Sequence, residues 1–300
     1  MFSKLRAQLL TPSAFQPRQD DSNPESTDRQ GEGTPVRTKT RNEVFSGSAW
    51  DALKVRHILR RKVGKGLPNE LVDKIMDAAE YWASEMAYMA VMPERSRQGN
   101  RVIVRQDHDM VVLKTVPLCF TKQGNDNASG LTPLPYRGTH PCRKIIFHLS
   151  SHDQGGGGDA TGPELYQKES WTWFDTEVIH AAHKRGAAEW LENEKGLVAH
   201  QIGPGAAPLH PGPNRLQINR GRVGSRQNVE IVWHYLDDIE PDSEEAGIIE
   251  RTKGRGRETL DGRGVRELQV GDAIAVWARA RFPNWTNIVY NASAQVFWAV

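Results

Sequence analysis

Three side chains that could bind a ligand recur at every second position near the end of the chain: Trp277, Arg279 and Arg281. The residues between them belong to an apolar series, which is Ile274, Val276, Ala278 and Ala280. Because side chains two residues apart share one face of a strand, the pattern predicts a core face and an opposite face with the tryptophan and the arginines. Such a surface is typical of recognition, so these three are candidate ligand-binding residues for a protein or a glycan. The alternative is that a covering layer, such as an amphipathic helix at 68–83 or the N-terminal segment, buries Trp277.

Acidic side chains form a second group with chemical potential. Asp153, Asp175 and Glu177 could supply the two facing carboxylates that a carbohydrate-processing or other hydrolytic enzyme needs. Their linear spacing does not pair them, and no Gly-x-Ser-x-Gly motif marks a catalytic serine. We therefore expect no catalytic residue, and a hydrolase on a jelly-roll fold is the alternative.

Metal and phosphate motifs are incomplete. His148 with His152, and His180 with His183, are suitably spaced pairs, but neither belongs to a His-Glu-x-x-His or zinc-finger pattern. The glycine run 155–158 lacks the Lys-Ser or Lys-Thr of a phosphate-binding loop. We expect no metal and no cofactor.

Two helices are predicted ahead of these residues. Ser48 can cap the first helix, which runs through Trp50 and Leu59. Pro68 suits the first position of a second helix over 68–83, whose apolar residues repeat every three to four positions. This apolar stripe consists of Leu71, Val72, Ile75, Met76, Ala79 and Trp82.

The start of the second helix, Leu67-Pro68-Asn69-Glu70-Leu71, resembles the opening of an F-box. F-box proteins use such a segment to bind the adaptor subunit of cullin-type ubiquitin ligases, and their C-terminal part then captures the substrate. The resemblance implies a protein partner, with a cullin-ligase adaptor as the candidate. The candidate partner-binding residues are Leu67, Pro68, Glu70, Leu71 and Ile75. The alternative is an ordinary amphipathic helix that packs on the β-module.

From Arg101 onward, apolar and polar residues alternate, which predicts antiparallel strands with one buried face. Many half-apolar strands need a second layer, so we expect a mainly β fold: an antiparallel β-sandwich or jelly-roll-like module. One helical interruption is expected around 187–194. The alternating runs are 102–104, 111–113, 145–149, 171–173, 216–218, 229–235, 274–280 and 294–300.

Four segments make this region similar to a β-rich module of uncharacterised fungal proteins. The segments are 152–155, 170–174, 231–235 and 271–285. The resemblance implies a β-rich fold and carries no activity with it.

Composition divides the chain into three parts. Residues 16–43 hold one hydrophobic residue, Val36, which predicts a disordered tail over 1–45. A helical segment over 46–95 and the β-sandwich over 96–300 follow.

The net charge of +2, from 39 basic and 37 acidic residues, argues against a nucleic-acid binder. No apolar run reaches the length of about 18 residues that a spanning helix needs, so no membrane association is expected.

Residues 1–15 are basic but lack the continuous apolar core of a secretory signal. We expect the cytoplasm or the nucleus, with a mitochondrial transit peptide as the alternative. The sequence predicts a non-catalytic binding or adaptor protein whose β-sandwich recognises a protein or a glycan. The F-box resemblance adds the hypothesis of a substrate receptor of a ubiquitin ligase.

Overall fold

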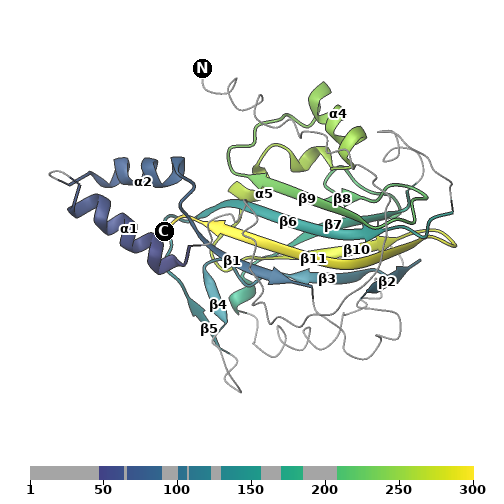
Figure 1. Cartoon of the computed structure of the whole chain (residues 1–300), viewed down its shortest axis with the longest axis horizontal. Coiled ribbons are helices and arrows are strands. Elements are labelled where there is room, and N and C mark those ends of the chain that lie inside the picture. Colours follow the sequence, from purple (N-terminus) through teal and green to yellow (C-terminus); the bar gives the residue numbers. More distant parts are fainter. Residues whose placement is uncertain are drawn as a thin grey trace, which may run out of the picture. The chain divides into compact units, whose positions relative to one another are not determined.

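A computed structural model describes residues 47–63, 66–89, 101–106, 108–122, 130–156, 170–184 and 208–300 (Figure 1). Secondary structure over these residues is mainly β, with two short helices ahead of the strands, which confirms the expected fold class. The predicted tail over 1–45 and the helix expected around 187–194 lie outside the described residues.

The two helices are α1 (Ala49–Arg61) and α2 (Asn69–Ala78). The side chain of Ser48 accepts a hydrogen bond from the backbone N–H of Asp51 and so caps the first turn of α1, as the sequence predicts. Pro68 stands immediately before α2, where its missing N–H leaves no hydrogen bond unmade. α2 ends earlier than predicted because the chain turns at Glu80, whose backbone is left-handed (φ 50°).

The strands form two large antiparallel sheets and a small hairpin. One sheet has the order β1-β11-β6-β9, with β2 also paired to β11, and the other has the order β3-β10-β7-β8; β4 and β5 form the hairpin. The strands are β1 (Ala83–Tyr88), β2 (Val102–Arg105), β3 (Met110–Lys114), β4 (Phe120–Lys122), β5 (Leu131–Pro133), β6 (Cys142–His152), β7 (Thr172–Ile179), β8 (Gln217–Ile218), β9 (Gln227–His234), β10 (Ala273–Ala280) and β11 (Thr286–Trp298).

Strand pairing follows a nested pattern. β1 pairs with β11, β3 with β10, β6 with β9, and β7 with β8, always antiparallel. Strands near the two ends of the chain thus pair with each other and enclose the pairs formed by strands from its middle. This is the winding of a jelly roll, and it confirms the predicted jelly-roll-like module. The predicted boundary at residue 96 is too late, because β1 pairs with β11 from Ala83 onward, inside the segment expected to be helical.

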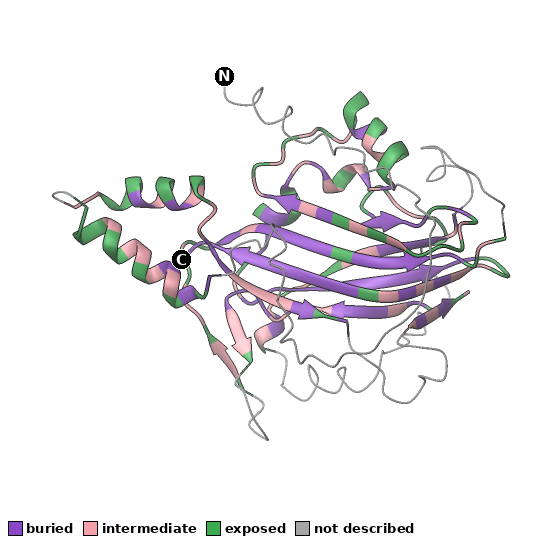
Figure 2. Ribbon diagram, viewed as in Figure 1, coloured by how far each residue is buried: buried purple, intermediate pink, exposed green. Residues whose placement is uncertain are grey.

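The two sheets enclose one hydrophobic core, visible in Figure 2 as buried ribbon along the long strands. Phe147 of β6 contributes from one sheet. The inward residues of β10, in the other sheet, are Ile274, Val276, Ala278 and Ala280, as the alternation predicts.

Short helices complete the described residues. They are η4 (Ala182–Lys184), α4 (Glu244–Lys253), η6 (Arg257–Thr259) and α5 (Arg263–Arg266). Within the described parts of the chain, none of the helices has the length and apolarity needed to cross a membrane.

Candidate functional site

Trp277 lies opposite the inward face of β10, but that side is not open. Trp277 is only 7 % exposed, and Arg279 and Arg281 are buried as well. The covered face, rather than an exposed patch, is therefore the alternative that the structure supports. The side chain of Trp277 packs with Val111 and Ala275, its neighbours in the same sheet.

Both arginines are paired with Asp109, immediately before β3. The Asp109 side chain is only 3 % exposed. Its carboxylate accepts hydrogen bonds from Nη1 and Nη2 of Arg281 at 2.6 and 2.7 Å, and a third hydrogen bond from Nη1 of Arg279. The Nε group of Arg279 donates to Asp175. When two opposite charges are buried together, charge-assisted hydrogen bonds between them offset the free-energy cost of removing each charge from water. The two guanidinium groups are thus engaged inside the protein instead of facing a ligand.

The candidate carboxylates of the hydrolase alternative also have structural partners. Asp175 accepts from Arg279, and Glu177 accepts from Nε1 of Trp277 at 2.8 Å. Asp153 is buried and accepts the backbone N–H of Gly155. Burial raises the pKa of Asp153 in spite of the hydrogen bonds that it accepts. None of these contacts sets two carboxylates facing each other across a cleft.

An aromatic cluster lies beside the turn from β10 to β11, and it consists of Trp171, His210 and Phe282. The ring centroids of Trp171 and Phe282 are 4.4 Å apart with planes at 74°, and the ring of His210 is 5.1 Å from that of Trp171. Phe282 remains 41 % exposed and His210 is exposed, so this aromatic surface is open to a ligand.

Arg281 links the buried charges to the aromatic cluster. Its backbone N–H donates to the carbonyl oxygen of Trp171 at 2.9 Å, and its Nε donates to the carbonyl oxygen of Pro208 at 2.9 Å. Pro208 stands two residues before His210, and Phe282 follows Arg281 directly. Arg281, predicted as a ligand contact, instead joins the three segments of the cluster through these two hydrogen bonds and its place in the chain.

Sequence reasoning missed this cluster. The signal present in the sequence is the density of aromatic residues at 171–174 and 282–285. His210 has no comparable signal, because its contact with Trp171 depends on how the loops meet in space.

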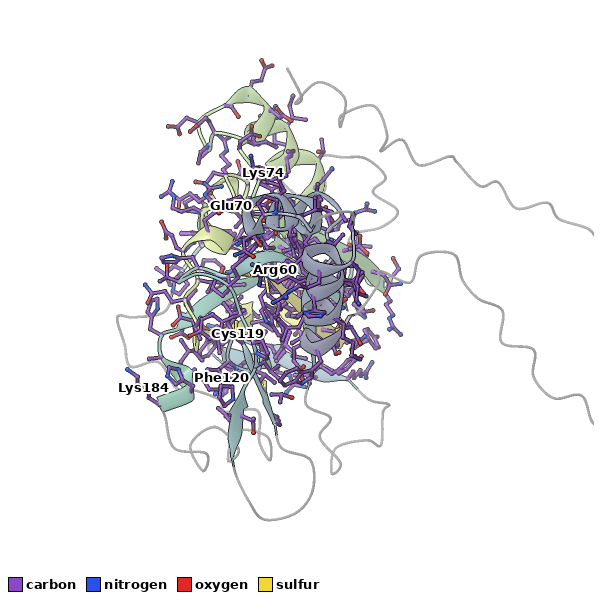
Figure 3. All side chains as sticks on the ribbon, turned by 90° about the vertical axis from the view of Figure 1, so that its left-hand side faces the viewer. Arg60, Glu70, Lys74, Cys119, Phe120 and Lys184 are labelled. Atoms are coloured by element: carbon purple, nitrogen blue, oxygen red, sulfur yellow. The ribbon has the colours of Figure 1, made fainter. Side chains whose placement is uncertain are left out.

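The apolar stripe of α2 is divided between two sides of the helix. Val72 and Met76 are buried in the core, whereas Leu71 is 47 % exposed and Ile75 is 43 % exposed. The helices face the viewer in Figure 3, which labels Lys74 on α2. The other predicted contact residues divide in a similar way: Leu67 packs partly on the core, while Pro68 and Glu70 are exposed.

Charged residues fasten α2 to the rest of the protein. Asp77 accepts from Nε1 of Trp82 at 3.0 Å and from Nη2 of Arg137 at 2.7 Å. Asp73 pairs with Arg56 of α1 and with Arg137, each at 2.7 Å. α2 is therefore held by its buried side chains and by these ion pairs, while Leu71 and Ile75 point elsewhere.

Metal-binding groupings are absent from the described residues: no three histidine, cysteine, aspartate or glutamate side chains gather there. The four histidines of the predicted pairs have other neighbours, which are Glu230 for His148, Tyr290 for His152, Asp272 for His180 and Phe120 for His183. Burial raises the pKa of both thiols, that of Cys142 to about 12, so neither Cys119 nor Cys142 is a ready nucleophile.

Fold and surfaces together define a jelly-roll protein that carries a helix pair before its first strand. Comparisons with protein-family models, with curated proteins and with solved structures found no match. A fold hosts many functions, so function has to be argued from the surfaces themselves.

Proposed function

We propose that the protein is a non-catalytic binding protein with two recognition surfaces. α2 presents Leu71 and Ile75 to a protein partner, and the loop end of the jelly roll recognises a second protein or a glycan. The observation that carries the proposal is the divided stripe of α2, in which Val72 and Met76 are buried and the other two residues stay exposed.

The exposed pair suits a docking role for a physical reason. Residues four positions apart are neighbours on a helix surface, so Leu71 and Ile75 form one apolar anchor. The helix is already fastened through Met76 and through the ion pairs of Asp73 and Asp77. A surface that needs no reordering loses less conformational entropy on binding.

The F-box resemblance names the partner that we propose for this surface, which is the adaptor subunit of a cullin-type ubiquitin ligase. Glu70 and Leu71, from the resembling motif, are both exposed in the first turn of α2. Because β1 follows α2 directly, the proposed adaptor contact is confined to the helix pair. The jelly roll would then be the substrate receptor.

The double variant Leu71→Ala with Ile75→Ala tests the proposal, and Met76→Ala on the same helix is the matched control. Truncating the half-exposed pair should leave the thermal melt almost unchanged and abolish binding to the purified adaptor in a pull-down. Met76→Ala removes a fully buried side chain and should lose about 2–5 kcal/mol of stability.

Two outcomes would count against this function. If the unaltered protein does not bind the purified adaptor, the ubiquitin-ligase role is wrong. If the double variant melts as early as Met76→Ala, then Leu71 and Ile75 stabilise the fold and do not form a docking surface.

A further inference from the structure

We infer that the aromatic cluster of Trp171, His210 and Phe282 is a binding site for a neutral glycan. The glycan site rests on the proposed binding function of the jelly roll and names the class of ligand for it. It replaces the predicted patch on β10, whose arginines are paired with Asp109.

The arrangement of the rings suits one face of a sugar. Trp171 and Phe282 meet edge to face, so they do not close into a flat stack, and Phe282 keeps much of its ring exposed. A pyranose presents C–H groups that pack against such a ring and hydroxyl groups that need hydrogen-bonding partners. The exposed imidazole of His210 and the exposed amide of Asn284, in the same turn as Phe282, can provide them.

Backbone strain indicates that the position of Phe282 is imposed. Phe282 has φ 66° and Asn284 has φ 72°, both in the left-handed region. A bulky residue rarely adopts this conformation, and such strain concentrates at binding sites, where the surrounding structure enforces it. The residue before Phe282, Arg281, is held in place by its hydrogen bond to the carbonyl oxygen of Trp171 and by its pairing with Asp109.

Charge argues for a neutral ligand over an acidic one. The guanidinium group of Arg281 lies next to the cluster, but its donors go to Asp109 and to the carbonyl oxygens of Pro208 and Ala280. Arg279 is shared between Asp109 and Asp175. With these charges satisfied internally, an anionic ligand gains no ion pair from them, whereas a sugar needs none.

The cluster also lies where sandwich folds commonly place recognition. Trp171 comes just before β7, His210 lies in the segment ahead of β8, and Phe282 is in the turn between β10 and β11. The turn from β10 to β11 is at the right-hand end of the sheets in Figure 1. Loops on a rigid sheet scaffold carry binding residues without disturbing the core.

A printed array of neutral glycans, anionic glycans and proline-rich peptides, incubated with the full chain, tests the inference. The full chain should bind neutral glycans, and both Phe282→Ala and His210→Ala should weaken that binding by about tenfold or more, which is about 1.4 kcal/mol. Tyr88→Ala, which removes an exposed aromatic ring from β1, is the matched control and should bind normally. Thermal melts of all variants confirm that each is folded.

Binding to anionic glycans alone, or to proline-rich peptides alone, would overturn the glycan inference, as would full glycan binding by folded His210→Ala. The glycan site and the proposed partner surface are tested independently, because the double variant Leu71→Ala with Ile75→Ala should bind glycans like the unaltered protein. An array with no bound glycan, beside a positive adaptor pull-down, would remove the glycan site and leave the partner surface standing.

Discussion

Asp109→Asn is expected to be severely destabilising, although it changes no shape. The carboxylate of Asp109 accepts two hydrogen bonds from Arg281 and one from Arg279. The side chains of Asp109 and Arg281 are equally buried, so solvent does not screen the pair. An asparagine keeps one acceptor oxygen but removes the charge and adds an N–H₂ group that faces other donors.

The magnitude follows from what each arginine retains. Arg279 keeps Asp175, but Arg281 is left with carbonyl oxygens only. Removing one partner of a buried ion pair typically lowers the free energy of unfolding by about 3–5 kcal/mol. For a domain of this size, that corresponds to a fall in melting temperature of about 6–20 °C.

Urea unfolding followed by tryptophan fluorescence measures the loss. Glu177→Gln is the control, because glutamine keeps an acceptor for Nε1 of Trp277 at an exposed position and should change stability by less than about 0.5 kcal/mol. Adding Arg281→Met to Asp109→Asn should recover part of the loss, since it removes the unpaired charge. If Asp109→Asn stays within about 1 kcal/mol of the parent, the buried network does not hold these loops.

Two further predictions concern the partly buried Glu85 and the buried Trp277. Burial raises the pKa of Glu85 above its ordinary value of 4.5, against the opposing charge of Lys122, so the folded state binds this proton more tightly and stability falls as the pH rises above 4.5. Glu85→Gln should therefore match the parent in urea unfolding at acid pH and exceed it at neutral pH; a constant difference between the two would contradict this. Trp277→Ala should lower the free energy of unfolding by about 3 kcal/mol or more, and with it the melting temperature, because the ring is buried and its Nε1 donates to Glu177. An unchanged melt would show that this side of β10 is open after all.

Local patterns determined a good part of this fold. The alternation at 274–281 correctly separated Val276, in the core, from Trp277, on the other side of the strand. The cap at Ser48 was predicted because its hydrogen bond reaches only to Asp51. Spacing also placed Leu71 and Ile75 on an apolar helix stripe. These features depend on residues a few positions apart, which a single sequence displays directly.

Tertiary structure decided everything that depends on distant partners. Asp109 lies 170 residues from Arg279, and only the pairing of β3 with β10 brings the two together, which turned a predicted ligand contact into a buried ion pair. The same packing divided the stripe of α2 into an inner and an outer pair. It also assembled Trp171, His210 and Phe282 from three loops, because their contacts are set by where the strands end in space and not by any spacing along the chain.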